Sequence, residues 1–450
     1  MTVQDCTEEL LRISRAHLIY SYTPIGSSPD IIFEDGNGIV LKDTRGKEYV
    51  DFGSGLVNVN IGHGRKELAE AAMAQMSKLG FTPSSRGTSH TAAILCAKKL
   101  VELIPEGLGR VFFCCTGSDA VDSAFKAARL YGRKQGKDKY KIISLHNSFH
   151  GYVYGTLSAT GLGNGIMARS LEPLLPGFVH IPAYNCYRCF FGLEYPDCDT
   201  RCARFLAEAI EREDEDTVAA FIAEPIQGSG GFICPPPTYW PLVRNICTEH
   251  NVLLIADEIM SGFGRTGKLF AMEHWGVKPD IMAIGKGITS GYIPFSAMAV
   301  TDRVIEGLPT TGLPQGGTYS AHPVSCAVAI RNMEILVQEK LTENAAAVGE
   351  HIMNRLSSEF MQFDHVGNVN GLGLMCGFEL VVDKDTRAKF DPAKAVGSQV
   401  LKRARDQGVL LRQFRDWLGL APPLTVTLEE ADRAIEVIKP IVSNVRALLG

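Results

Sequence analysis

The stretch Val252-Leu253-Leu254-Ile255-Ala256 is apolar throughout and is followed directly by the acidic pair Asp257-Glu258. A run of this length without polar alternation is typical of a strand that is buried on both faces of a sheet. Five further runs share this character, at residues 111–115, 141–145, 218–223, 281–284 and 295–300. Because helical patterns occur between these runs, the sequence predicts an α/β fold around a mostly parallel sheet.

The two ends of the chain differ from this central part. Residues 31–50 have a hairpin-like pattern around Asp35-Gly36-Asn37-Gly38, a turn sequence that favours antiparallel strands. Beyond about residue 330, a long helical pattern leads into short strand patterns and a final helix at 428–449. We therefore expect a smaller α+β domain that shares its sheet with the N-terminal hairpin.

The composition excludes several classes of protein. Of the 450 residues, 45% are hydrophobic, which excludes a largely disordered chain. The 45 basic and 50 acidic side chains give a net charge of −5, so no broad basic surface is available for nucleic acid or a membrane. No apolar run approaches the roughly 20 residues of a membrane helix. The 12 cysteines occur without a recognisable signal peptide, and we expect a cytoplasmic protein with mostly free thiols.

Polar residues follow four of the apolar runs, at the points where the predicted strands end. They are Asp257, Lys286, Glu224 and the turn Thr116-Gly117-Ser118. A single lysine or acid at a strand end is most often solvated or caps a helix. The carboxyl ends of parallel strands meet at one edge of a sheet, however, so four such ends together predict one cleft.

The turn Thr116-Gly117-Ser118 precedes a helical pattern and is a candidate anion site. The free amides and the dipole at a helix start favour a phosphate group. The alternative is plain N-capping by Ser118, which this turn alone favours. Asp119 and Asp122 also lie in the first turn, and we expect both side chains to point away from any phosphate.

Longer motifs give the chain a family resemblance. They are Ala256-Asp257-Glu258-Ile259-Met260-Ser261-Gly262-Phe263-Gly264-Arg265-Thr266-Gly267 with Lys286 further on, Tyr49-Val50-Asp51-Phe52-Gly53-Ser54-Gly55, Gly62-His63-Gly64, Phe149-His150-Gly151, Glu224-Pro225-Ile226-Gln227-Gly228, Gly317-Thr318-Tyr319-Ser320-Ala321-His322-Pro323 and Ala421-Pro422-Pro423-Leu424. In this order they resemble the class III aminotransferases that depend on pyridoxal 5'-phosphate, over nearly the whole chain.

The resemblance implies fold type I, with a mostly parallel seven-stranded sheet in a large domain and a smaller α+β domain. The implied limits are an N-terminal segment at 1–60 that joins the small domain, a large cofactor domain at 61–328 with a Cys-rich excursion at 184–203, and a small domain at 329–450. It also implies a homodimer, or a dimer of dimers, in which Thr318 reaches the phosphate of the partner's site.

The resemblance implies a role for each motif residue. Lys286 would form the Schiff base with the cofactor and move the proton during transfer. Asp257 would keep the pyridine nitrogen protonated, so that the ring acts as an electron sink. The remaining implied cofactor contacts are Gly117 and Ser118 at the phosphate, Phe149 and Ile259 on the two ring faces, His150 beside Phe149, and Glu224 near the ring hydroxyl.

Positions that depart from the family pattern restrict the range of expected substrates. Ser229 and Gly419 stand where the branches that use 2-oxoglutarate carry a glutamate and an arginine, and Met260 replaces a common glutamine. These positions are more similar to the ω-amino acid and amine:pyruvate branch. There an arginine that Arg412 matches binds the carboxylate, with Arg415 as the second choice. The alternative is that Arg412 is a surface residue of a strand.

The resemblance also places Tyr20, Leu56, Val57, Phe81 and Trp417 in the substrate pocket. Some relatives in the amine branch carry tryptophan at the position of Val57. The smaller side chain predicts a wider pocket that tolerates bulkier amines.

Four cysteines lie within seventeen residues, at Cys186, Cys189, Cys198 and Cys202. Their spacing resembles a structural zinc loop. Two disulfides or four free thiols are equally open explanations, and each places the cluster away from catalysis.

The sequence therefore predicts an aminotransferase that moves an amino group from an ω-amino acid or amine to a keto acid such as pyruvate. The expected reaction is ping-pong, through pyridoxamine phosphate. A racemase, an epimerase or a decarboxylating transaminase on the same scaffold is the nearest alternative. A non-catalytic zinc or assembly protein is disfavoured by the intact Lys286, Asp257 and Gly117-Ser118. A nucleotide-binding oxidoreductase is disfavoured because no strand is followed by Gly-x-Gly-x-x-Gly.

Overall fold

The computed structural model describes residues 3–162 and 170–449. Its central element is a seven-stranded sheet in the order β4-β10-β9-β8-β7-β5-β6. The strands are β4 (Arg110–Cys114), β5 (Lys141–Leu145), β6 (Phe178–Ile181), β7 (Val218–Ala223), β8 (Leu253–Asp257), β9 (Ile281–Ile284) and β10 (Ser296–Val300). Only β10 runs antiparallel to its neighbours. The predicted α/β fold with a mostly parallel sheet is confirmed.

Six of these strands coincide with the six apolar runs of the sequence. The seventh, β6, was not predicted because it is only four residues long, contains His180 and lies at the edge of the sheet.

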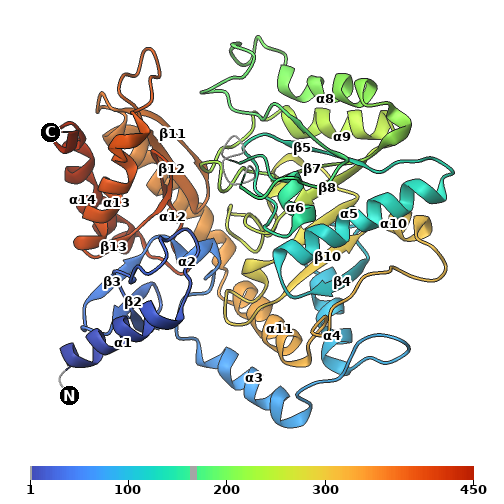
Figure 1. Cartoon of the computed structure of the whole chain (residues 1–450), viewed down its shortest axis with the longest axis horizontal. Coiled ribbons are helices and arrows are strands. Elements are labelled where there is room, and N and C mark those ends of the chain that lie inside the picture. Colours follow the sequence, from blue (N-terminus) through green and yellow to red (C-terminus); the bar gives the residue numbers. More distant parts are fainter. Residues whose placement is uncertain (1–2, 163–169, 450) are drawn as a thin grey trace.

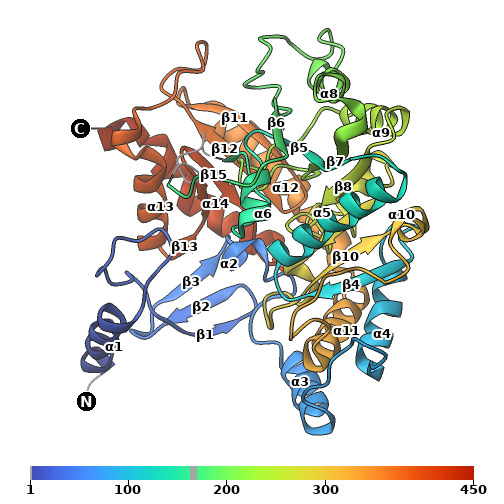
Figure 2. The ribbon, with the colours of Figure 1, turned by 45° about the vertical axis from the view of Figure 1, so that its right-hand side comes forward.

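Helices cover both faces of this sheet (Figures 1 and 2). In β8, Leu253 and Ile255 pack with residues of α5 (Gly117–Lys134), whereas Leu254 and Ala256 pack with α8 (Arg201–Arg212) and α9 (Tyr239–Glu249). Alternate side chains of one strand thus enter two apolar layers, which explains why the run lacks polar alternation. The shorter helices α6 (Tyr154–Ala159) and α10 (Asp302–Gly307) complete this part.

Two smaller sheets form a second body, at the left in Figures 1 and 2. One contains β1 (Phe33–Asn37), β2 (Val40–Asp43), β3 (Glu48–Asp51) and β13 (Val409–Leu410), and the other contains β11 (Val366–Leu372), β12 (Met375–Leu380), β15 (Trp417–Leu420) and β14 (Arg412–Phe414). The pairing of Val409 with Val50 joins the C-terminal part of the chain to the N-terminal hairpin. The domain limits themselves remain a prediction.

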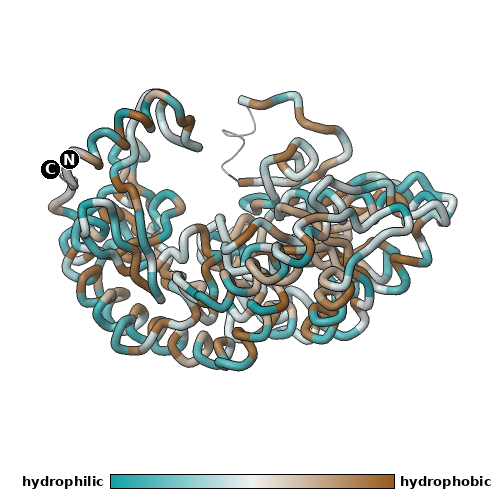
Figure 3. Tube along the Cα trace, turned by 90° about the horizontal axis from the view of Figure 1, so that it is seen from below, coloured by the Kyte–Doolittle hydropathy of each residue, from teal (hydrophilic) through white to brown (hydrophobic). Residues whose placement is uncertain are grey.

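The remaining helices are α1 (Val3–His17), α2 (Ser54–Val57), α3 (Lys66–Lys78), α4 (Thr91–Val101), α11 (Pro323–Gln338), α12 (Leu341–Arg355), α13 (Val396–Asp406) and α14 (Leu428–Ser443). The last helix ends earlier than predicted, and residues Val445–Leu449 form a 3₁₀ turn. Figure 3 shows both termini on the side of the smaller body. Within residues 3–162 and 170–449, no helix combines the length and the apolar character needed to cross a membrane.

The Cys-rich excursion leaves the large sheet and contacts the smaller body. Arg188 donates from Nε to Glu379 Oε1 on β12 at 2.8 Å, and from Nη1 to the carbonyl of Arg387 at 2.8 Å. The guanidinium groups of Arg188 and Arg387 also lie 5.2 and 5.1 Å from the ring centre of Tyr187. This arrangement ties the two bodies together at a distance from the strand ends.

Candidate active site

A cavity of about 190 Å³ lies at the carboxyl ends of β4, β5, β7, β8 and β9. It is lined by Thr116, Gly117, Ser118, Phe149, His150, Gly151, Tyr152, Glu224, Asp257, Ile259, Met260 and Lys286. The four strand ends that the sequence singled out therefore meet in one cleft. All the residues predicted to contact a cofactor line it, except Thr318.

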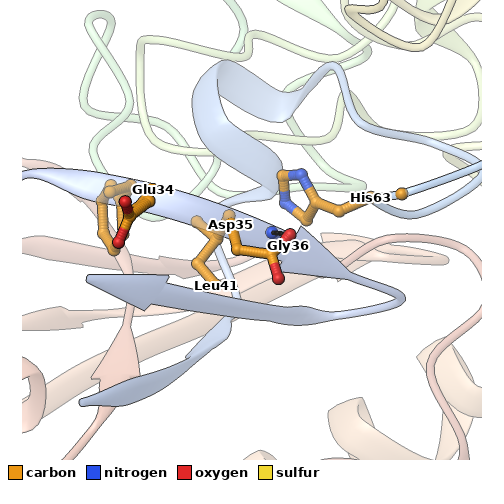
Figure 4. A pocket seen from close by; sticks show the side chains of 7 residues that line it. Glu34, Asp35, Gly36, Leu41 and His63 are labelled. Atoms are coloured by element: carbon orange, nitrogen blue, oxygen red, sulfur yellow. Dashed lines mark hydrogen bonds between the residues drawn. The ribbon is translucent and has the colours of Figure 1, made fainter. Parts of the chain in front are cut away.

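A larger and more open hollow of about 340 Å³ lies in the N-terminal hairpin (Figure 4). Its lining consists of Phe33, Glu34, Asp35, Gly36, Leu41, His63 and Gly64. The His63 ring donates or accepts at Nε2 with Asp51 Oδ2 at 3.0 Å, which holds it in the hairpin packing. Since this lining contains no lysine and no residue of the strand ends, the cavity at the sheet is the candidate active site.

Asp257 and His150 form a buried pair at the base of the cavity. His150 Nδ1 lies 2.7 Å from Asp257 Oδ2, and the His150 side chain is fully buried. The other carboxylate oxygen of Asp257 accepts from the amide of Ile259 at 3.2 Å. These bonds fix the orientation of a carboxylate that is 4% exposed and leave it facing the cavity.

Glu224 closes a second side of the cavity. Its two carboxylate oxygens accept from the amides of Phe149 and Gly228, at 2.9 and 2.8 Å. Burial raises the pKa of this carboxyl to about 7, with a further increase from Asp257, while His150 and the two amides act in the opposite direction. Glu224 can therefore hold a proton near neutral pH.

Lys286 follows β9 and points its amine into the same space. Burial lowers the pKa of the amine to about 8. The acids Asp257 and Glu224 raise it, and the guanidinium groups of Arg412 and Arg265 lower it further. With a pKa of about 8, roughly a tenth of this amine is unprotonated at pH 7, far more than for an ordinary lysine. The unprotonated form is the state that a nucleophilic or basic lysine requires.

The N-terminus of α5 forms the end of the cavity opposite the acids. Thr116 caps the helix: its Oγ1 accepts from the Asp119 amide at 3.2 Å, and Asp119 Oδ2 accepts from the Thr116 amide at 3.0 Å. Ser118 was the residue considered for capping, but its Oγ accepts from the Tyr152 amide at 3.3 Å. Because first-turn amides have no acceptor within their helix, those of Gly117 and Ser118 are available to an anion.

Asp119 lies in the first turn and Asp122 in the second, and both acids are engaged elsewhere. Asp119 belongs to the cap, and Asp122 forms an ion pair with Lys126 at 2.7 Å. The helix start therefore keeps the positive character that an anion needs.

Glycines line this end of the cavity, where a side chain would be too close to the neighbouring walls. A Cβ at Gly117 would lie 2.8 Å from Cδ1 of Ile259, and a Cβ at Gly151 would lie 2.3 Å from Oγ of Ser118. No side chain fits at either position without displacing a cavity wall. Ile259 and Phe149 both line the space between the acids and the helix start, where a flat ring would lie.

Arg412 lies outside the cavity lining but close to it. It is on β14, and its Nη1 donates to the carbonyl of Gly55 at 3.4 Å. Its Nε is buried without a partner, and no carboxylate within the described part of the chain forms an ion pair with it. Burial lowers the pKa of this guanidinium, whereas Asp51 and Tyr152 raise it. Arg415 is exposed in the turn after β14.

The other predicted pocket residues occupy varied environments. Val57 is 1% exposed and packs with Phe232, Met375 and the cavity residue Met260. Trp417 is 5% exposed and packs against Gly231. Leu56 is 64% exposed, and the Tyr20 hydroxyl lies 2.7 Å from Ser14 Oγ at the end of α1. None of these four lines the cavity in the single chain.

Thr318 and Phe81 lie together on another exposed surface. The Phe81 ring is 6.1 Å from that of Tyr319, the residue after Thr318, and 5.9 Å from that of His322. Thr318 is exposed, and Phe81 and Tyr319 are 46% and 62% exposed. Neither Thr318 nor Phe81 lines the cavity of its own chain.

Sequence reasoning did not assign Tyr152 to the cavity. Tyr152 follows Phe149-His150-Gly151 directly, and its ring packs 4.9 Å from Phe149 and 6.1 Å from Tyr22. The only signal for Tyr152 was its position after the motif.

The four cysteines of the excursion are free thiols. Among residues 3–162 and 170–449, no three histidine, cysteine or acidic side chains are arranged to hold a metal ion. The zinc alternative for these cysteines stays a prediction. Cys202 lies on α8 and packs against the apolar layer beneath it, whereas Cys186 is exposed at the start of the excursion.

Comparisons with known proteins identify the family of the chain. Residues 22–442 match the family model of class III aminotransferases. The chain is 37% identical to the diaminobutyrate–2-oxoglutarate transaminase of Halomonas elongata, over 93% of this chain and 92% of that protein. It is 34% identical to the putrescine–pyruvate aminotransferase of Pseudomonas aeruginosa, over 98% and 97% of the two chains.

A solved structure shows the same fold. It is the thermostable (S)-enantioselective omega-transaminase of Thermomicrobium roseum, with a TM-score of 0.93 and 40% identity over 98% of both chains. The chain belongs to the class III aminotransferases, and it is an enzyme that transfers amino groups with pyridoxal 5'-phosphate as its cofactor.

Proposed function

We propose that this aminotransferase moves the amino group of an amine or ω-amino acid to pyruvate, in a ping-pong reaction through pyridoxamine phosphate. The choice of pyruvate as the amino acceptor rests on the packing around Gly419. A Cβ at this position would lie 2.5 Å from the Phe232 ring and 3.3 Å from Cβ of Arg412. An arginine side chain cannot enter there, so Arg412 is left as the candidate receptor for a carboxylate.

The residues of the cavity fit pyridoxal 5'-phosphate. The helix start at Gly117 and Ser118 suits the phosphate, and the glycine-lined wall leaves room for it. Asp257 suits the ring nitrogen, Phe149 and Ile259 suit the two ring faces, and Glu224 suits the ring hydroxyl. When bound, the cofactor supplies an electron sink for the carbon that carries the amino group.

The protein residues then act on protons and charge. Lys286 would hold the cofactor through its amine, and the same amine would hold or move a proton at the reacting carbon. Asp257 carries the negative charge that keeps the ring nitrogen protonated, and His150 fixes the orientation of that carboxylate at 2.7 Å. Glu224, with its pKa raised to about 7 by burial, accepts or donates a hydrogen bond according to pH.

A half-reaction tests the proposed function. Incubation of the holoenzyme with an amine donor alone should convert the bound cofactor stoichiometrically to pyridoxamine phosphate, and pyruvate should reverse this change. Absorbance spectra and cofactor extraction measure both steps. With an α-amino acid in place of the amine, a racemase would exchange the α-proton without this conversion, and a decarboxylating transaminase would release carbon dioxide. Either result would contradict the proposal.

Arg412 gives a prediction on the acceptor side. In Arg412→Leu, kcat/KM for pyruvate should fall by about 10–100-fold, because one charge-assisted bidentate contact is lost. The rate with an amine that has no carboxylate should change little. Arg415→Leu is the matched control, since Arg415 is exposed in the next turn. Equal losses in both variants, or an equal loss for the uncharged amine, would exclude Arg412 as the carboxylate receptor.

Gly117 gives a prediction on cofactor binding. In Gly117→Ala, the new Cβ would meet Ile259 at 2.8 Å, so we expect cofactor affinity to fall by more than about 10-fold, which corresponds to roughly 1.4 kcal/mol. Fluorescence titration of cofactor-free protein with pyridoxal 5'-phosphate measures this affinity. Gly109→Ala is the control, because no atom lies within 4 Å of a Cβ there and the backbone is not in the left-handed region. Unchanged affinity in Gly117→Ala would remove Gly117 from the phosphate site.

A homodimer accounts for the positions of Thr318 and Phe81. Both are exposed in the single chain and lie away from its own cavity. Exposed apolar side chains continue this surface along α3 and α4, with Met73, Met76, Ile94 and Leu95 between 50% and 66% exposed. An apolar surface of this kind favours association. We propose that it carries Thr318 to the partner's cofactor phosphate.

A further inference from the structure

Arg265 has a fully buried guanidinium in the loop that follows Asp257. Its Nη2 donates to Asn60 Oδ1 at 2.9 Å and to Ser54 Oγ at 3.3 Å. Its Nη1 donates to the carbonyls of Pro422 and Leu374. The side chain thus joins the N-terminal segment, the loop after β8 and the smaller body at one point.

This cation has no acidic partner within the described residues. All its acceptors are neutral oxygens, and its Nε has no partner. Asp51 exerts the largest favourable charge effect on it, but the carboxylate of Asp51 is bonded to His63 and to the amides of Gly53 and Gly55. A buried charge without a counter-ion is unfavourable for stability, so a role in the site would explain why this residue is present.

Asn60 connects Arg265 to Lys286. Its Oδ1 accepts from Arg265, and its Nδ2 donates to the carbonyl of Phe263 at 2.8 Å. The same Nδ2 would lie 2.6 Å from a Cβ at Gly287, so Asn60 packs directly against the residue after Lys286. Movement of Asn60 would therefore release the turn that carries Lys286.

The backbone of Lys286 needs such support. Its φ of 41° lies in the left-handed region, which side chains other than glycine rarely adopt. A strained residue keeps its conformation only where its surroundings restrain it. On the far side of the turn, Asn332 donates to the carbonyls of Gly287 and Ile288 at 2.8 and 3.0 Å. Asn60 supplies the restraint on the near side.

We propose that Arg265 is a positioning residue for Lys286, which acts through Asn60 on the Lys286 turn and through its own fixed, unpaired charge on the amine. Since the role of Lys286 as the cofactor-binding lysine is itself proposed above, this role of Arg265 rests on it. Two acids, Asp257 on β8 and Glu224 after β7, face the amine and favour its protonated form. Arg265 and Arg412 on β14 oppose them.

Two pairs of variants separate charge from structure. Arg265→Gln removes the positive charge. Arg265→Lys keeps the positive charge but lacks the planar guanidinium that donates to several acceptors at once. Asn60→Asp places a counter-ion beside Arg265, whereas Asn60→Ala only removes the contact. All four should unfold at lower temperature than the parent. Arg355→Gln, in the ion pairs of α12 with Glu359 and Asp432, is the control for lost stability alone.

The readout is protonation at the Lys286 nitrogen. In the holoenzyme, the visible absorbance of the bound cofactor is followed against pH. In cofactor-free full-length protein, reductive methylation of Lys286 is followed against pH by peptide mapping. Arg265→Gln and Asn60→Asp should raise both midpoints by about 1 pH unit, the size expected for the loss or neutralisation of one nearby charge. Arg265→Lys, Asn60→Ala and Arg355→Gln should leave the midpoints near the parent value. Asn60→Ala, which frees the Lys286 turn without changing a charge, should instead raise the rate of Lys286 methylation above the midpoint, and Arg355→Gln should not.

The proposal would be overturned if the midpoints in Arg265→Gln and Asn60→Asp stayed at the parent value. It would also be overturned if Arg265→Lys shifted the midpoint as much as Arg265→Gln, or Asn60→Ala as much as Asn60→Asp. If Arg265→Gln does not fold, the Asn60 pair still gives the contrast. Borohydride reduction of the parent holoenzyme keeps the two proposals distinguishable. Attachment of the cofactor at a residue other than Lys286 would refute the proposed function, whereas attachment at Lys286 without the midpoint contrast would refute only the role of Arg265.

Discussion

Replacement of Lys286 by alanine should lower the rate of amino transfer by about 10⁴-fold, the upper range for loss of a positioned acid–base group. This amine is expected to bond the cofactor and to move the proton at the reacting carbon, and no other lysine lines the cavity of the described chain. Single-turnover conversion of the cofactor by an amine donor measures the effect. Borohydride should no longer attach the cofactor to the protein.

Lys139→Met is the matched control for this prediction. Lys139 is also buried, at 1% exposure, but its amine donates to the carbonyl of Asn251 at 3.0 Å, away from the cavity. The variant should be less stable than the parent and should still bond the cofactor at Lys286. If Lys286→Ala kept a rate within tenfold of the parent, another group would have to be the catalytic base.

Replacement of Asp257 by asparagine should lower the same rate by about 10²–10³-fold, a loss typical for removal of one group that stabilises developing charge. Asparagine has nearly the shape of aspartate but no negative charge, so it cannot keep the ring nitrogen protonated. It also breaks the charge-assisted contact with His150 at 2.7 Å. The rate of the donor half-reaction, measured at saturating cofactor, isolates this effect from weaker cofactor binding.

Glu258→Gln is the control for Asp257→Asn. Glu258 is the adjacent residue and is fully buried, and burial raises the pKa of its carboxyl to about 7. Its carboxylate accepts from the Met272 amide at 2.8 Å and from the Ser261 hydroxyl at 2.5 Å, on the side of β8 that faces away from the cavity. A half-reaction as slow in Glu258→Gln as in Asp257→Asn would show that burial, not the ring contact, explains the loss.

The chemistry of the cavity was largely predictable from the strand ends. Apolar runs fix which strands are buried on both faces, and parallel strands bring their carboxyl ends to one edge. Asp257, Lys286, Glu224 and Ser118 each come directly after such a run or two to three residues beyond it, so their proximity follows from topology. For this reason the polar residues of the cavity could be named from the sequence, whereas the packing around them could not.

The packing around the cavity could not be predicted because it depends on contacts between distant segments. Val57 packs with Phe232, Met375 and Met260, and its place in the substrate pocket stays a prediction. The spacing of the four cysteines suggested zinc, and it gave no sign that Cys202 on α8 packs against an apolar layer. The spacing of residues in the sequence does not specify where their side chains point. That direction depends on the helices and loops that pack around each side chain.

The sequence by itself determined the fold class, the family, and the acid, amine and helix start that meet in the cleft, because strand periodicity and local motifs encode them. The tertiary structure alone decided how that cleft is held. It placed Arg265 within hydrogen-bond distance of Asn60, which is 205 residues away in the sequence. It also packed Asn60 against the Lys286 turn. It also filled the space beside Gly419 with Phe232. Contacts between residues so far apart arise only from three-dimensional packing, whose outcome no local pattern specifies.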